Sequence, residues 1–275
     1  MSSHPGSIDR RVTIHDLAAM RSDGERFAVV TAYDTITAEV MDAAGVPVLL
    51  VGDSLGMVVL GHPTTLPVTL DTMIHHASAV VRARPRALIV VDLPFGTYQE
   101  GPTQALTSAV RVMKESGADA VKIEGGARIV PAVRALTDAG IPVMGHLGLT
   151  PQSVGQFGGF RVQGRDEASA DRIVEDAVNI AEAGAFATVL ECIPSTLAAR
   201  VTAASPVPTI GIGAGASVDG QVIVWQDLLG LTGGRRPRFV RTYADLRGSM
   251  VDAVESFCSD VREGRFPSEA ESYGD

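Results

Sequence analysis

Lysine is rare in this chain, and one of its two lysines stands inside an apolar segment. Of 23 basic residues only Lys114 and Lys122 are lysines. Lys122 and Glu124 lie two positions apart among valine and isoleucine, so in an extended strand both side chains project to the same face. A buried ammonium is costly unless it is paired. Lys122 therefore either forms a structural ion pair with Glu124 or offers a positive charge to a substrate carboxylate.

Carboxylates recur where other short apolar segments end, at Asp34, Asp53, Asp92 and Glu191. Asp34 precedes a predicted helix, so it could be either the N-cap of that helix or a site residue. Asp53 and Asp92 precede loops that contain glycine or proline, where capping is less natural. Two or more carboxylates at one place suit Mg²⁺, a hard cation that retains several waters. Glu124 could add a third ligand, directly or through water.

Further polar side chains complete the candidate site. Glu191 ends an apolar segment, where a carboxylate can serve as a proton-transfer group. His146 could be a core histidine or a substrate contact. Tyr33 and Ser54 stand next to Asp34 and Asp53, at the ends of the same two segments. Together these residue types indicate metal-assisted enolisation of a small oxo-acid, because a divalent ion can bind a keto oxygen and a carboxylate together and acidify the adjacent C–H.

A repeated pattern indicates the elements that position these residues. Helix-like stretches end in Ala-Gly or Ser-Gly, as at Ala44-Gly45 and Ser116-Gly117, and a short apolar run follows each. Glycine just past a helix end supplies the left-handed cap, and short apolar runs suit parallel strands that are buried on both faces. Strands are predicted over residues 27–31, 46–51, 87–91, 120–123, 141–144, 186–190, 209–212 and 221–225. Helices are predicted over residues 14–21, 35–44, 70–82, 104–116, 129–139, 168–183, 196–204 and 243–263.

Eight parallel strands within about 250 residues predict an α/β fold, a (β/α)₈ TIM barrel with an N-terminal helix and a C-terminal helical extension. One barrel domain is expected over residues 1–275, with termini that are mobile over 1–12 and 267–275. The carboxyl ends of the strands would surround one mouth, where the candidate residues converge. A doubly wound open sheet is the alternative. The glycine run at 211–215 supports it weakly, since it follows the seventh strand rather than the first.

Composition excludes several classes of protein. The chain has 275 residues, 45% of them hydrophobic, and a net charge of −9. Such a chain can fill a large core, and its acidity disfavours nucleic acid as a partner. No apolar run reaches the roughly 18 residues of a membrane helix, so no membrane partner is expected. The polar N-terminus is unlike a secretory signal, and two cysteines form no disulfide framework. We therefore expect a cytoplasmic protein.

Ordered segments across residues 13–267 make the sequence resemble the ketopantoate hydroxymethyltransferase family. The matching segments are residues 31–34, 51–57, 65–69, 92–96, 121–126, 145–153, 211–215 and 219–222. The resemblance implies a (β/α)₈ barrel that assembles as a homodecamer. It implies transfer of a hydroxymethyl group from 5,10-methylenetetrahydrofolate to 3-methyl-2-oxobutanoate, an oxo-acid, in pantothenate and coenzyme A biosynthesis. The product is 2-dehydropantoate, also called ketopantoate.

The resemblance also implies roles for single residues. Asp53 and Asp92 match the family's Mg²⁺ ligands, Glu124 matches a third acid of the metal site, and Glu191 matches the proton acceptor. Matches to the contacts of the oxo-acid substrate are Asp53, Ser54, Asp92 and Lys122. His146 matches a histidine at the mouth, which we also assign to the substrate.

The chain departs from the family pattern at three positions. Pro63 stands where an Asp is usual, Gln226 where many members have His, and Glu271 where His is usual. These departures bear on loop geometry, folate contacts and ordering of the tail. Two other functions stay open. One is a Mg²⁺-dependent carbon–carbon lyase of the phosphoenolpyruvate mutase and isocitrate lyase group, which the absence of a visible lyase cysteine motif disfavours. The other is a non-catalytic oligomeric homologue.

Overall fold

The computed structural model describes residues 10–234 and 236–274. The chain divides into two compact units, one ending at Val224 and one beginning at Trp225. In the first unit eight parallel strands close into a barrel in sequence order, because β1 pairs with both β2 and β8. The predicted TIM barrel is thereby confirmed. The strands are β1 (Phe27–Thr31), β2 (Val48–Val51), β3 (Leu88–Asp92), β4 (Ala120–Glu124), β5 (Val143–Gly148), β6 (Ala187–Glu191), β7 (Thr209–Ile212) and β8 (Gly220–Ile223).

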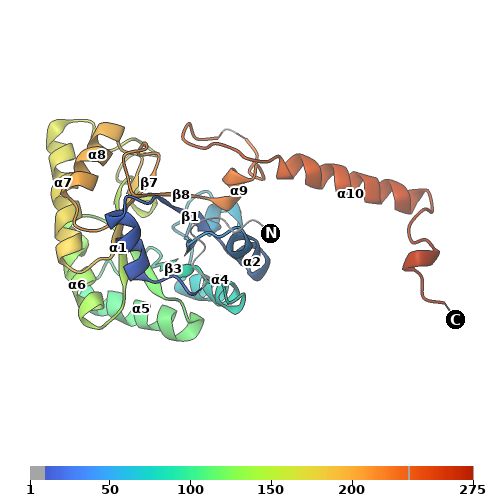
Figure 1. Cartoon of the computed structure of the whole chain (residues 1–275), viewed down its shortest axis with the longest axis horizontal. Coiled ribbons are helices and arrows are strands. Elements are labelled where there is room, and N and C mark those ends of the chain that lie inside the picture. The colour runs from blue at the N-terminus through green and yellow to red at the C-terminus, as the bar shows by residue number, and fades with distance from the viewer. Residues whose placement is uncertain (1–9, 235, 275) are drawn as a thin grey trace. The chain divides into compact units, whose positions relative to one another are not determined.

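Helices alternate with the strands of the barrel. They are α1 (Ile14–Ser22), α2 (Thr35–Ala43), α3 (Leu55–Val58), α4 (Leu70–Arg82), α5 (Pro102–Ser116), α6 (Val130–Asp138), α7 (Glu167–Glu182) and α8 (Ser195–Ala204), with 3₁₀ turns η1 (Ala127–Ile129) and η2 (Pro151–Ser153). In Figure 1, α5, α6, α7 and α8 follow one another around the outside of the barrel. Helix α5 shows the local cause: Pro102 occupies its first turn, and Gly117, with φ of 77°, ends it.

The barrel interior is packed with apolar side chains. Every residue of β2, β3 and β4 is buried, as expected for parallel strands that are covered on both faces. Val48, Val90 and Met144 belong to one core cluster. Leu17 of α1 and Phe27 of β1 belong to the same cluster, so the predicted N-terminal helix closes the amino-terminal end of the barrel. Only the opposite end is left for the predicted site.

Six of the eight strands have bounds that differ from the prediction, and the ends of the fifth and eighth strands matter most for the site and the second unit. The fifth strand continues to Gly148 and therefore contains His146, whereas the prediction ended at residue 144. Gly145, the first residue beyond the predicted end, is paired in register with Thr188 of β6. The eighth strand ends at Ile223, so its prediction as 221–225 runs too far. Trp225 instead begins the short helix α9 (Trp225–Leu228).

The second unit contains α9, α10 (Leu246–Arg262) and the 3₁₀ turn η3 (Glu269–Glu271). Helix α10 confirms the predicted C-terminal helical extension, which begins three residues later than predicted because Asp245 caps it by accepting from the backbone of Gly248. The single domain over 1–275 stays a prediction. So does mobility of the termini, of which residues 1–9 and 275 lie outside the described residues. No helix in the described ranges is both long and apolar enough to cross a membrane.

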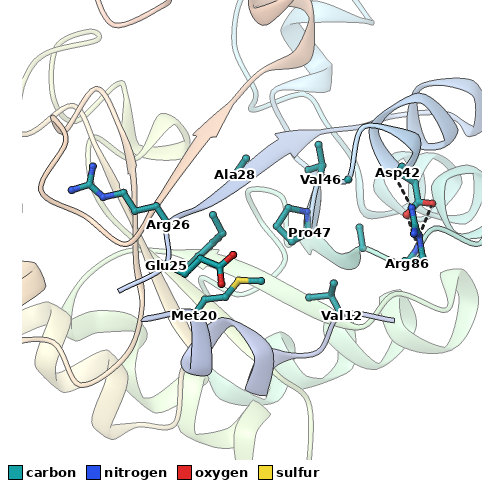
Figure 2. Close-up of a pocket in the computed structure, with 12 residues that line it drawn as sticks. Val12, Met20, Glu25, Arg26, Ala28, Asp42, Val46, Pro47 and Arg86 are labelled. Atoms are coloured by element: carbon teal, nitrogen blue, oxygen red, sulfur yellow. Dashed lines mark hydrogen bonds and ion pairs between the residues drawn. The ribbon is translucent and has the colours of Figure 1, made fainter. Parts of the chain in front are cut away.

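A cavity of about 250 Å³ lies at the amino-terminal end of the barrel. Figure 2 shows Val12 and Met20 on one side of it and Val46 and Pro47 on the other, with the Asp42–Arg86 ion pair at its edge. Its lining comes from α1 and from residues before or at the start of β1, β2 and β3. It is therefore remote from the strand ends that carry the candidate residues.

Candidate active site

Side chains from neighbouring strands meet at the end of the barrel where the strands' carboxyl ends lie, which we call the mouth. In the strand ladder, Asp92 of β3 stands opposite Lys122 of β4, and Glu124 of β4 stands opposite His146 of β5. All four residues are between 2% and 4% exposed. The alternation of side chains along β4 explains why Lys122 and Glu124 reach the same group of polar residues.

Lys122 is paired with an acid, but not with the acid nearest in sequence. Its Nζ lies 2.6 Å from Oδ1 of Asp92. Burial alone would lower the pKa of Lys122, but attraction by Asp92, Glu124 and Asp53 outweighs it and raises that pKa above its ordinary value. Lys122 is therefore a permanent positive charge, fixed on β4 between the acid of β3 and the histidine of β5.

His146 lies between two carboxylates. Its Nδ1 is 3.1 Å from Oε1 of Glu124, and its Nε2 is 3.2 Å from Oε2 of Glu191. Burial and the charge of Lys122 lower the pKa of His146, but the two glutamates outweigh them and raise it to about 9. Nδ1 also lies 3.4 Å from Nζ of Lys122. Burial alone would raise the pKa of Glu124, but His146 and Lys122 outweigh it and lower that pKa. The ring of His146 thus contacts Glu124 through Nδ1 and lies within ion-pair distance of a second carboxylate, Glu191, through Nε2.

Asp53 and Asp92 share one corner of the site. The backbone N–H of Asp53 donates to Oδ2 of Asp92 over 3.0 Å. Burial, with repulsion from Asp92 and Glu124, holds the pKa of Asp53 well above its ordinary value. Burial also raises the pKa of Asp92, against the effect of Lys122. Burial is the largest cause of both shifts, and the four carboxylates at the mouth outnumber its two basic side chains, Lys122 and His146.

This corner fits a divalent cation. Within the described residues no three His, Cys, Asp or Glu side chains are arranged to hold a metal ion. Mg²⁺, however, is commonly held by one or two carboxylates together with waters and substrate oxygens. Oδ1 of Asp53 accepts no hydrogen bond from the described residues, whereas both oxygens of Glu124 are engaged by His146 and by a backbone N–H. Asp53 is therefore the most available ligand, with Asp92 beside it.

Two buried residues that sequence reasoning missed support these acids. Gln152, in the turn after β5, donates through Nε2 to Oδ2 of Asp53 and to the carbonyl of Leu93, each over 2.9 Å. Its backbone N–H donates to Oε2 of Glu124 over 3.1 Å. Tyr98 donates to Oε1 of Gln152 over 2.6 Å and so fixes which way its amide points. Gln152 lies inside the matched segment 145–153, which was the one available signal.

Ser54 and Tyr33 contact each other next to Asp53, whereas Asp34 caps a helix. The hydroxyl of Ser54 lies 2.9 Å from the hydroxyl of buried Tyr33, beside Asp53 in sequence. Asp34 accepts from the backbone N–H of Thr37 over 2.8 Å, so it is the N-cap of α2. Of the two alternatives for Asp34, capping is thus the one the structure supports. The other predicted acids belong to the mouth.

The backbone around Glu191 is tightly defined. Gly148 has φ of 88°, and a Cβ at that position would lie 2.3 Å from the carbonyl oxygen of Glu191. Cys192, the next residue, has φ of 48°, an uncommon conformation for a residue other than glycine. Its N–H donates to the carbonyl of Ile212 on β7 over 2.9 Å. The end of β6 is thereby held from both neighbouring strands, which fixes the direction in which Glu191 leaves the strand.

Replacing Gln152 with Leu should lower the free energy of unfolding by about 2–4 kcal/mol, since it leaves the buried acceptors on Asp53 and Leu93 without their donor. Urea unfolding at a fixed Mg²⁺ concentration measures the loss. Gln156→Leu is the matched control, because Gln156 lies four residues further along the chain and is exposed. If both variants lost the same free energy of unfolding, the buried amide of Gln152 would not stabilise the acids at the mouth.

Comparison with solved structures places the fold. Phosphonopyruvate hydrolase, solved in complex with oxalate and Mg²⁺, superposes with a TM-score of 0.61 at 13% identity, over 96% of this chain and 92% of that one. For 2,3-dimethylmalate lyase, a member of the PEP mutase/isocitrate lyase superfamily, the TM-score is 0.56 at 17% identity, over 94% and 91% of the two chains. At such identities the likeness concerns the barrel fold alone.

Sequence comparison is more specific. A family model described as ketopantoate hydroxymethyltransferase matches residues 11–269. A 3-methyl-2-oxobutanoate hydroxymethyltransferase from Moorella thermoacetica is 58% identical, with 96% of this chain and 98% of the relative covered. One from Thermobifida fusca is 55% identical, with 99% and 100% covered. The hydrolase and the lyase share only the barrel fold with this chain, whereas the two transferases share more than half of its residues. The chain belongs to the ketopantoate hydroxymethyltransferase family.

Proposed function

We propose that the protein transfers a hydroxymethyl group from 5,10-methylenetetrahydrofolate to 3-methyl-2-oxobutanoate and so forms 2-dehydropantoate, with Mg²⁺ at Asp53 and Asp92. The observation that carries the proposal is the buried group at the mouth, in which Lys122 and His146 are set among four carboxylates. Relatives of the same sequence family bear the name of this activity. A structural neighbour solved with Mg²⁺ and oxalate supports a metal in a barrel of this kind.

The oxo-acid binds where positive charge is fixed. Lys122 offers a charged Nζ to the substrate carboxylate, and the hydroxyl of Ser54 can hydrogen-bond to it. When bound, a divalent ion supplies a Lewis acid that polarises the keto oxygen and makes the C3 proton more acidic. Asp53 and Asp92 would hold that ion, and Glu124 would act on it through water because both its oxygens are already engaged.

Glu191 removes the C3 proton. Its side chain is 17% exposed, the most open of the mouth carboxylates that carry an ion-pair contact. His146 faces Oε2, so Oε1 is the oxygen that is left to accept the proton. The C–H electron pair passes to the C2–C3 bond as the enolate forms. C3 then bonds to the methylene carbon of the donor as one of the two C–N bonds of that carbon breaks. The oxygen of one water bonds to the same carbon as the second C–N bond breaks. The C3 proton held by Glu191 and one proton of the water pass to the two released nitrogens, so that the donor leaves as tetrahydrofolate.

The test is product formation from 3-methyl-2-oxobutanoate, 5,10-methylenetetrahydrofolate and Mg²⁺, with each omitted in turn. Ketopantoate should form only when all three are present. Exchange of the C3 proton with solvent should require the protein and Mg²⁺ but not the folate. Ketopantoate formation that is indifferent to folate would refute the donor, and cleavage of a carbon–carbon bond in place of transfer would favour the lyase alternative.

Two further properties stay predictions. Assembly as a homodecamer follows from the family resemblance, and a cytoplasmic location follows from the composition of the chain. Sedimentation of the purified protein would test the first. The positions of Pro63, Gln226 and Glu271, where the chain departs from the family pattern, lie outside the proposed metal and proton-transfer residues.

A further inference from the structure

A second cavity, of about 390 Å³, opens beside the mouth. It is lined by Gly125 and Arg128 after β4, by Gly148 at the end of β5, by Gln163 further along the chain, and by Arg172 of α7. Gly125 directly follows Glu124, and Gly148 packs against the backbone of Glu191. The cavity therefore adjoins two residues of the proposed proton-transfer group while having its own lining.

The charges in this cavity favour an anion. Neither Arg128 nor Arg172 forms an ion pair with a carboxylate of the described residues, and Arg128 donates only to the neutral hydroxyl of Ser153, over 2.8 Å. The one carboxylate of the lining, Asp176, is turned to the backbone, where its Oδ1 accepts from the N–H of Ala127 over 2.7 Å. Asp176 attracts Arg172 without forming an ion pair with it, so the lining carries two guanidinium groups against one carboxylate.

We propose that this cavity binds the carboxylate-bearing glutamyl end of the folate donor. The proposal rests on the proposed function, because that function supplies the donor. Guanidinium groups bind carboxylates in a two-pronged geometry, and the glutamyl end of a folate carries two carboxylates. Small-molecule sites span about 300–1,000 Å³, so a cavity of this size holds one end of a folate rather than all of it. The rest of the donor extends towards Glu191, where the methylene carbon is needed.

Arg128→Gln and Arg172→Gln test the assignment, with Arg134→Gln as the matched control. Arg134 is exposed on α6 and does not line the cavity. Two donors are compared, 5,10-methylenetetrahydrofolate and the same donor without its glutamate. For the natural protein the KM of the shortened donor should be at least about tenfold higher, as expected when a charge-assisted hydrogen bond is lost. Each cavity variant should raise the KM of the full donor about tenfold and leave that of the shortened donor nearly unchanged.

Direct binding supplies a readout that is independent of turnover. Calorimetry with tetrahydrofolate, without oxo-acid, should show a Kd about tenfold weaker for either cavity variant and unchanged for Arg134→Gln. The KM for the oxo-acid substrate and the folate-independent C3 exchange should stay at their natural values in all three. Cavity variants that keep the natural Kd, or that weaken both donors equally, overturn the cavity assignment alone. A natural protein that binds tetrahydrofolate but forms no ketopantoate overturns the proposed function and leaves the cavity supported.

Discussion

Replacing Glu191 with Gln should slow the loss of deuterium from C3 of 3-methyl-2-oxobutanoate by about 10²–10⁴-fold, the range that a positioned general base contributes. The amide has nearly the shape of the carboxylate but cannot accept the proton. His146 keeps its contact with Glu124 and so stays anchored. The measurement is NMR of C3-deuterated substrate in ordinary water, with Mg²⁺ present and folate absent, which isolates proton removal from transfer.

Glu182→Gln is the matched control for this variant, because Glu182 is an exposed acid at the end of α7. It should exchange deuterium at the natural rate. The affinity of Glu191→Gln for the oxo-acid should change little, since Lys122 and the metal corner bind the substrate. Natural exchange rates in Glu191→Gln would show that another group takes the C3 proton, and the role given to His146 as its support would fall with it.

The fold and much of the site could be predicted because both follow from periodic features of the chain. Gly117 and Gly140 mark where helices end, and an apolar run follows each of them. Once these runs are taken as parallel strands, their carboxyl ends must share one mouth. Asp92, Lys122 and Glu124 are brought together by strand pairing alone, which is why a linear sequence suffices to find them.

The supporting residues and the partners within the site could not be predicted, because they depend on contacts between loops and between strands that no periodic pattern in the sequence indicates. Tyr98 and Gln152 lie in connections after β3 and β5, and nothing local indicates that one orients the other. The partner of Lys122 could not be assigned either. Spacing along one strand suggested Glu124, whereas the register between strands brings Asp92 to 2.6 Å. The role of His146 depended on the same register, because Glu124 and Glu191 lie on the two strands that flank β5.

Asp53→Asn should raise the melting temperature of the metal-free protein at pH 8 while removing most of the stabilisation that Mg²⁺ provides. The pKa of Asp53 is well above its ordinary value in the folded chain, because of burial and of repulsion from Asp92 and Glu124. A raised carboxyl pKa means that the folded state binds the proton more tightly than the unfolded state. Its contribution to stability is complete below about pH 4, the unfolded value, and is lost as pH rises through the folded value. Asparagine cannot ionise, so the variant should lack this loss.

Asp53→Asn should stabilise the metal-free protein but reduce the stabilisation by Mg²⁺, and these two opposite effects make the prediction specific. A ligand that binds only the folded state stabilises it by about 2.7 kcal/mol at 100 times its Kd. The natural protein should gain this at pH 8, and Asp53→Asn should gain little because its available oxygen is no longer charged.

Asp119→Asn is the control. Asp119 is also an acid whose burial raises its pKa, but it accepts from Ile89 at the amino-terminal end of the barrel. It should therefore keep the full Mg²⁺ gain. If Asp53→Asn gained as much stability from Mg²⁺ as the natural protein, Asp53 would be excluded as a ligand. If the variant instead lost that gain and had a higher metal-free melting temperature, both results would have one cause. The metal would then relieve the repulsion between the carboxylates at the mouth.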